Sequence, residues 1–146
     1  MRLCAANWMI YAANNWLRPI YDLLRAELIA NEILHADETT VQVVKERGRS
    51  AAQKSYMWMY HTGRDAVRQA ALFEYQATRE GVHALDFLAG FKGYLHVDGY
   101  AGYKKLEDQG VILVECWAHV RRKFFDTLKT LKKEDRANAV ASVGLD

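Results

Sequence analysis

The order and spacing of five β-type segments limit the fold of this chain more than any other feature. They span residues 33–44, 55–60, 70–76, 94–98 and 111–115. Polar, turn-forming connections separate the first three, which predicts an antiparallel meander. Helical segments precede the fourth and the fifth, and a last helix begins near Trp117. We therefore predict an α/β fold with one five-stranded mixed sheet flanked by helices. The first strand should lie beside the fourth, and helix 117–131 should pack on the sheet through Trp117, Phe124 and Leu128.

The N-terminal part of the chain is expected to be helical. Apolar residues recur at intervals of three and four over residues 3–30, as they do along one face of a helix. Pro19 suits the first turn of a second helix, so we expect a helical hairpin that serves packing.

The first and fourth β-type segments repeat one local pattern, Leu-His-x-Asp. Strands disfavour aspartate, and a buried charge is costly unless something pairs with it. The two-residue period of a strand places His35 and Asp37 on one face, and His96 and Asp98 likewise. On neighbouring strands the two aspartates would face each other at about 5 Å.

Two carboxylates that close repel each other unless a cation lies between them. Oxygen ligands of this kind suit Mg²⁺ or Mn²⁺. Two such ions, about 4 Å apart, activate the attacking oxygen and stabilise the leaving oxygen in phosphoryl transfer. The pattern therefore predicts a metal site at Asp37 and Asp98. The structural alternative is that Asp37 caps a turn and that Asp98-Gly99 only forms a turn after a strand.

Basic residues are concentrated in two places, although the net charge of the 146-residue chain is only +2. Such clusters indicate either a polyanion such as DNA or a solvated helix face. The candidate DNA contacts are Lys45, Arg47, Arg49, Arg121, Arg122 and Lys123.

The two cysteines, Cys4 and Cys116, are too few and too far apart for a disulfide framework, which fits a reducing cytoplasm. Cys116-x-x-His119 has the spacing of half a zinc site, but the other cysteine is distant in sequence. The first thirty residues contain no apolar run long enough for a signal peptide or a membrane span. We expect a cytoplasmic protein without a membrane partner.

Four stretches, LHADETTVQV, YMWMY, FLAGFKGYLHVDGYAGY and CWAHVRRKFFD, occur in this order. Together they resemble the catalytic core of the DDE transposases of the insertion sequence 66 family. The preceding NWMIYAANNWLRPIYDLLRAELI is similar to the helical lead-in of that family. The resemblance extends to about Leu131 and implies a ribonuclease H-like core at 32–146 after a lead-in at 1–31.

This resemblance implies a Mg²⁺-dependent bacterial enzyme that cleaves and joins the ends of a mobile DNA element as an oligomer on DNA. Asp37 and Asp98 match the first and second metal-binding carboxylates of the family. Its third acid, a Glu, lies beyond the AHVRRKF helix, and no later acid of this chain matches it. Asp126 follows His119 along one helical face and can in principle substitute, but surface solvation explains it more simply. We therefore expect a core truncated before the third acid, with weak metal binding and incomplete activity.

The remaining predictions concern a basic triplet, residues beside the acids and rival functions. Arg121, Arg122 and Lys123 resemble a basic triplet of the family and are expected to hold DNA phosphates without reading sequence. Four residues are candidates for supporting the acids, with ordinary hydrogen bonding or core packing as the alternative: His35, His96, His119 and Tyr100. Two rival functions stay open. One is a non-catalytic, DNA-binding or dimerising remnant of a transposase, and the other is a stand-alone nuclease whose site is completed by a local acid.

Overall fold

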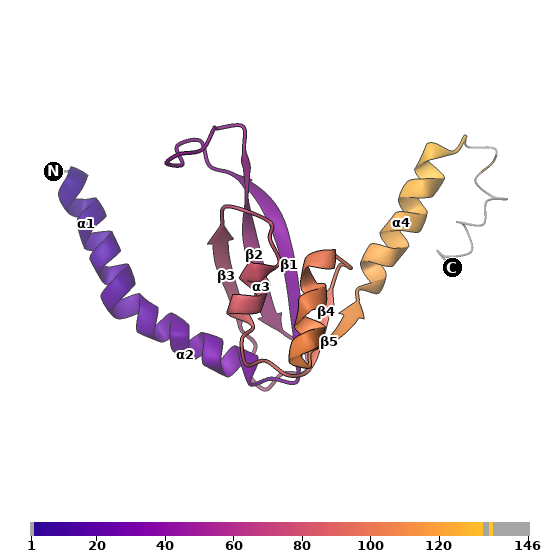
Figure 1. Ribbon diagram of the computed structural model, residues 1–146, viewed down its shortest axis with the longest axis horizontal. Helices are drawn as coiled ribbons and strands as arrows, with labels where there is room; N and C mark the ends of the chain where they lie inside the picture. Colours follow the sequence, from indigo (N-terminus) through magenta and orange to yellow (C-terminus); the bar gives the residue numbers. More distant parts are fainter. Residues whose placement is uncertain (1, 133–134, 136–146) are drawn as a thin grey trace.

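All five expected strands form one mixed sheet in the computed structural model, which describes residues 2–132 and residue 135 (Figure 1). The strands are β1 (Ile33–Gln42), β2 (Lys54–Thr62), β3 (Ala71–Gln76), β4 (Tyr94–Val97) and β5 (Ile112–Glu115). Their spatial order is β3-β2-β1-β4-β5. The first three strands pair antiparallel, whereas β4 pairs parallel to β1 and β5 parallel to β4. The predicted meander, the mixed sheet and the β1–β4 pairing are confirmed, and the arrangement is that of a ribonuclease H-like fold.

One face of the sheet carries the hydrophobic core. It is covered by α3 (Val82–Phe87) and by the 3₁₀ helix η2 (Ala101–Gln109). Alternate residues of β2 point into this layer, so Trp58 and Tyr60 are fully buried. The Tyr60 ring stacks on Phe87 of α3 with 3.8 Å between ring centroids. The strand period therefore sets which side chains enter the core.

The opposite face of the sheet is open. Its side chains include several large apolar ones that are exposed: Ile33, Phe73, Tyr75, Tyr94 and Ile112. Parallel strands are normally covered on both faces. The β1-β4-β5 half of this sheet therefore presents apolar surface that such strands usually bury.

The N-terminal helices form a continuous rod, so the expected hairpin is wrong. The rod consists of α1 (Arg2–Ala12), the π-helical turn η1 (Ala13–Leu17) and α2 (Arg18–Ile29). The residues at both junctions keep right-handed helical backbone angles. Pro19 lies in the first turn of α2, directly after the wider π turn. A proline removes a backbone N–H from a continuous helix, and a π turn is one of the irregularities found at such positions. The sequence 13–18 contains no glycine that would reverse the chain.

The last helix, α4 (Trp117–Thr130), points away from the sheet (Figure 1). Leu128 is buried, but Trp117 is 79% exposed and Phe124 37% exposed. The predicted packing of this helix on the sheet through Trp117 and Phe124 is therefore wrong, and Leu128 does not belong to the hydrophobic core cluster of the sheet. Among the helices that the structure describes, none combines the length and apolar character needed to cross a membrane.

Candidate functional site

Asp37 lies in the middle of β1, and Asp98 directly follows the neighbouring strand β4. The parallel register pairs Leu34 with Leu95 and His35 with His96. Continued by two residues, this register brings Asp37 and Asp98 level with each other. Ligands in sheets of this kind bind outside the carboxyl ends of parallel strands. The sequence prediction that these two acids come together is consistent with this pairing.

The two aspartates are held by local backbone hydrogen bonds. Asp37 is exposed, and its Oδ1 accepts a hydrogen bond from the backbone N–H of Glu38 at 2.9 Å. Asp98 Oδ1 accepts from the backbone N–H of Tyr100 at 2.8 Å, which closes a turn around Gly99. Gly99 has a φ of +83°, a left-handed conformation that favours glycine. Both carboxylates are thus fixed close to the backbone, and each keeps an oxygen that these bonds do not use.

Glu38 is the acid that sequence reasoning missed. Its side chain is 0% exposed because the strand period places it on the core face with Leu34 and Ala36. Its Oε2 accepts a hydrogen bond from the Tyr103 hydroxyl at 2.7 Å, and its Oε1 accepts from Arg79 Nε at 2.7 Å. Burial raises the pKa of the Glu38 carboxyl, while the hydrogen bonds from Tyr103 and Arg79 oppose that shift. The signal was present in the sequence, since an acid on an apolar strand face requires partners.

Arg79 connects Glu38 to Asp98. It lies in the segment between β3 and α3, and its Nη2 is 3.7 Å from Asp98 Oδ2. The guanidinium lies over the Tyr100 ring, with 4.1 Å to the ring centroid. The Tyr100 hydroxyl in turn donates a hydrogen bond to the Arg79 carbonyl. Tyr100, a predicted supporting residue, therefore lies beside the second acid and orients Arg79.

Histidines form a row on the open face of the sheet, the face that Asp37 shares. The His35 ring stacks on His61 with 4.6 Å between centroids, and its centroid is 4.9 Å from that of His96. Burial lowers the pKa of His35, and the neighbouring His61 and His96 lower it further. His61 was missed by sequence reasoning, although it directly opposes His35 in the β1–β2 register. His119 is remote from this row in sequence, and its Nδ1 is buried without a hydrogen-bond partner among the described residues.

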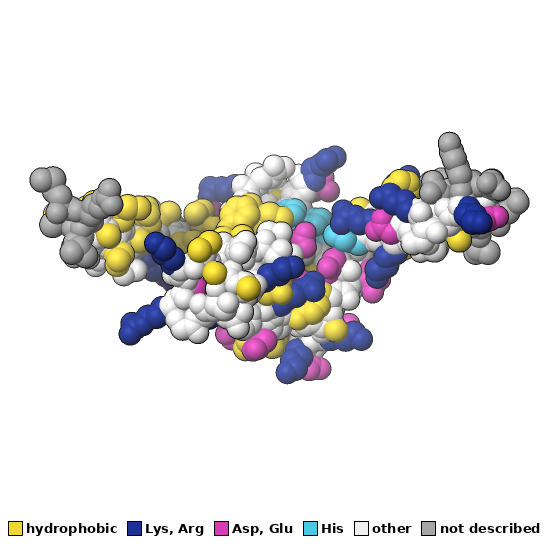
Figure 2. Space-filling model, turned by 90° about the horizontal axis from the view of Figure 1, so that it is seen from above, with side chains coloured by type: hydrophobic (Ala, Val, Ile, Leu, Met, Phe, Trp, Pro, Cys, Tyr) yellow, Lys and Arg dark blue, Asp and Glu magenta, His cyan; other side chains and the backbone are white. Residues whose placement is uncertain are grey.

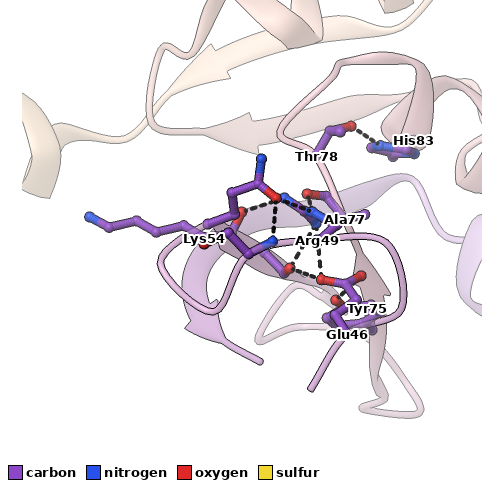
Figure 3. Close-up of polar contacts among 10 residues, drawn as sticks. Glu46, Arg49, Lys54, Tyr75, Ala77, Thr78 and His83 are labelled. Carbon is purple, nitrogen blue, oxygen red and sulfur yellow. Dashed lines mark hydrogen bonds and ion pairs between the residues drawn. The ribbon is translucent and has the colours of Figure 1, made fainter. Parts of the chain in front are cut away.

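Arg49, one of the six candidate DNA contacts, holds the loop between β1 and β2 together (Figure 3). Its guanidinium donates to Glu46 Oε2 at 3.1 Å, to Ser55 Oγ at 2.9 Å and to the Lys54 carbonyl at 3.1 Å. It also donates to the Ala77 carbonyl beyond β3. These contacts give Arg49 a structural role, whereas the other five candidates are all exposed: Lys45, Arg47, Arg121, Arg122 and Lys123.

The carboxylates of Asp37 and Asp98 have the donor chemistry that Mg²⁺ or Mn²⁺ prefers. A further acid, Glu115 at the end of β5, lies close by: a Cβ added at Gly99 would be 3.4 Å from Glu115 Oε1. Within the described part of the chain, no three His, Cys, Asp or Glu side chains form a group arranged to hold a metal ion. A metal ion held at Asp37 and Asp98 would therefore have two carboxylate ligands and would take its other ligands from water or phosphate oxygens.

Comparison with known proteins finds a matching family and curated relatives. The model of the family described as "Transposase IS66 family" matches residues 2–145. Two relatives from Sinorhizobium fredii strain NGR234, both named as uncharacterized proteins, are y4hP and y4qI. The first is 31% identical over 129 residues, covering 82% of this chain and 23% of the relative. The second is 30% identical over 139 residues, covering 86% and 25%. The chain thus spans about a quarter of the length of these curated relatives. No solved structure matches it.

Proposed function

Because this chain belongs to the IS66 family of transposases, we propose that it carries two acids of a site for DNA strand cleavage and strand transfer. The observation that supports the proposal most directly is the parallel β1–β4 pairing, which brings the strand positions of Asp37 and Asp98 together. Because the proposed substrate is DNA, we propose a location in the bacterial cytoplasm.

In the proposed site, Asp37 and Asp98 would hold Mg²⁺ or Mn²⁺, in a two-metal arrangement. The bound ions would polarise the attacking oxygen and stabilise the leaving oxygen of phosphoryl transfer. The chain itself supplies position: Asp37 projects from a paired strand, and the Asp98 carboxylate is fixed by its bond to the Tyr100 N–H. Such fixed geometry matters because misplacement by about 1 Å can cost 10²-fold in rate. With only two carboxylates, we expect weak metal binding that phosphate oxygens of DNA strengthen.

DNA would be held by exposed basic side chains on α4 and on the β1–β2 loop. Figure 2 shows histidine, acidic and basic side chains grouped on one side of the sheet, where it meets α4. Arg121, Arg122 and Lys123 are exposed on this helix, and Lys45 and Arg47 are exposed on the β1–β2 loop. Contacts from such residues to phosphates fix the position of DNA without selecting a sequence.

We further propose that the N-terminal rod pairs with the rod of a second copy. Residues 3–17 contain no charged side chain, and a helix that is apolar all round is normally buried. Figure 2 shows hydrophobic side chains along this rod. The exposed ones are Trp8, Met9, Ile10, Tyr11, Trp16, Leu17, Ile20, Leu23 and Leu24. An aromatic side chain alone can bury about 150–250 Å², so this stripe approaches the roughly 800 Å² per partner of a standard interface.

The test of the proposed site is metal binding by the chain and by its Asp37→Asn and Asp98→Asn variants. Free Mn²⁺ is counted by electron paramagnetic resonance during titration. Wild type should bind Mn²⁺, and each substitution should weaken binding about tenfold or more, since each removes one of two charged ligands. Equal binding by all three proteins would contradict the site.

The alternative is a DNA-binding or dimerising element that does not cleave. The exposed basic residues and the apolar rod favour it as much as they favour the enzyme. The same titration separates the two, because a remnant without a metal site predicts no dependence on Asp37 or Asp98.

A further inference from the structure

Arg79 is held in place from several sides. Its Nε donates to Glu38 Oε1 at 2.7 Å, and Glu38 itself is fixed because its other oxygen accepts from the Tyr103 hydroxyl. The Tyr100 ring lies under the guanidinium, and the Tyr100 hydroxyl holds the Arg79 carbonyl. A long, flexible side chain is thereby restricted to one position at the carboxyl end of β4.

The remaining contact of this guanidinium is with the second acid of the proposed site. Arg79 Nη2 lies 3.7 Å from Asp98 Oδ2, which is longer than a hydrogen bond but within ion-pair range. The Arg79 side chain is 42% exposed, so a solvated cation or a DNA phosphate can approach it. The Asp98 oxygen that faces Arg79 is the one that the Tyr100 N–H does not use.

We propose that Arg79 is a built-in counter-cation for Asp98, which competes with a divalent metal ion for that carboxylate. The proposal rests on the proposed function, since it takes Asp98 as a metal ligand. In the metal-free site the guanidinium neutralises Asp98 and keeps it in position. When the ion binds, Arg79 gives up Asp98 and keeps Glu38, because its contact with Glu38 is shorter and lies on a buried side chain.

Arginine suits this role because it stays protonated at all accessible pH values. A lysine or histidine beside a divalent cation can lose its proton, which removes the charge repulsion between the side chain and the ion. Arg79 keeps its charge, so it must either move away from the ion or remain beside it against that repulsion. Repulsion between a fixed unit charge and a divalent ion a few ångströms apart, in a half-exposed site, is large enough to lower metal affinity by about tenfold. Metal binding would therefore become favourable mainly when DNA is bound. The DNA phosphates would then supply further ligands to the ion and an anionic partner for the Arg79 guanidinium.

The structural alternative is that Arg79 only compensates the buried charge of Glu38. Arg79→Gln alone does not separate the two roles if it unfolds the chain, because it leaves Glu38 buried without its ionic partner. The pair Glu38→Gln/Arg79→Gln removes both charges, keeps hydrogen-bonding side chains of similar size and leaves the net charge unchanged. Arg68→Gln is the matched control, since Arg68 pairs with Glu27 on the surface.

The experiment is a Mn²⁺ titration read by electron paramagnetic resonance. It compares wild type with four variants: Arg79→Gln, the double variant, Arg68→Gln and Asp98→Asn. Near-ultraviolet circular dichroism checks that each variant is folded. We expect the double variant, and Arg79→Gln if folded, to bind Mn²⁺ about tenfold more tightly than wild type. Arg68→Gln should match wild type. Unchanged or weaker binding by the double variant, together with lost binding by Asp98→Asn, would overturn the role of Arg79 and leave the proposed function intact. Unchanged binding by Asp98→Asn would overturn both.

Discussion

Adjacent carboxylates on β1 have opposite environments. Asp37 is exposed and hydrogen-bonds to the backbone beside it, whereas the Glu38 side chain is buried and joins Arg79 to Tyr103. The strand period is the cause, since neighbouring residues point to opposite faces. One acid is therefore available to a ligand, and the next stabilises the fold.

This difference predicts unequal effects on stability for the same change. Glu38→Ala leaves the Tyr103 hydroxyl and the Arg79 guanidinium without their acceptor, and should lower the free energy of unfolding by about 3 kcal/mol. Asp37→Ala, the matched control, should change it by less than about 0.5 kcal/mol. Urea unfolding, followed by the fluorescence of the buried Trp58, measures both. Equal losses in the two variants would contradict the structural role of Glu38.

At the scale of elements, the helices attach to the sheet at few points. Tyr21 is one of them: its hydroxyl lies 3.3 Å from Glu74 Oε1 and 3.5 Å from the Phe73 carbonyl of β3. Burial, together with the nearby Glu74 charge, raises the pKa of Tyr21 to about 12. The docking of α2 on β3 thus depends on a neutral tyrosine.

The pH dependence follows from that shift. The folded chain holds the Tyr21 proton more tightly than the unfolded chain, whose tyrosines titrate near 10. This contribution to stability is complete below pH 10 and is lost as the pH rises toward 12. The free energy of unfolding should therefore fall more steeply between pH 10 and 12 in wild type than in Tyr21→Phe. If the free energy of unfolding, measured by urea titration, changes with pH equally in wild type and Tyr21→Phe, the proposed contribution of Tyr21 is wrong.

Helix α4 supplies the second prediction at this scale. If Arg121, Arg122 and Lys123 bind phosphates, replacing the three with Ala should reduce the salt dependence of DNA binding. The slope of log K against log salt should fall by about 0.9 for each phosphate that the variant no longer neutralises. Fluorescence anisotropy with duplexes of two unrelated sequences measures the slope. Lys104→Ala/Lys105→Ala on η2 is the control, and an unchanged slope for the triple variant would assign the triplet to a solvated helix face.

At the scale of the whole molecule, the chain exposes more apolar surface than a lone domain usually does. The open sheet face and the N-terminal rod both contribute to it (Figure 2). Pairing of the rods predicts a dimer in light scattering coupled to size-exclusion chromatography. Trp8→Ser/Trp16→Ser should shift the chain to monomer, whereas Trp117→Ser, which changes a similarly exposed tryptophan outside the rod, should not. A wild-type chain that elutes as a monomer at all concentrations would contradict this pairing.

The sequence predicted the strands of the sheet better than it predicted the positions of the N-terminal rod and of α4. Alternation and the order of segments were enough for β1 to β5, because a strand's burial pattern is local. The course of the rod and of α4 depends on tertiary contacts, which the helical period alone does not specify. The sequence pattern also could not identify the hydrogen-bond partners of Glu38, because Arg79 and Tyr103 are 41 and 65 residues away in sequence. The strand period thus predicted which face of each strand is buried, but not which polar groups meet there.

The parallel pairing of β1 with β4 also has a consequence for the time at which the site forms. The meander of β1, β2 and β3 can assemble from neighbouring segments as soon as they leave the ribosome. The strand positions of the two aspartates come level only when Tyr94 has paired with Ile33, some sixty residues later in the chain. Closing so long a loop is slow compared with local pairing. In a nascent chain, the β1-β2-β3 meander is therefore expected to form before the proposed site at Asp37 and Asp98. The metal site proposed at Asp37 and Asp98 can therefore form only after β4 has been synthesised and has paired with β1.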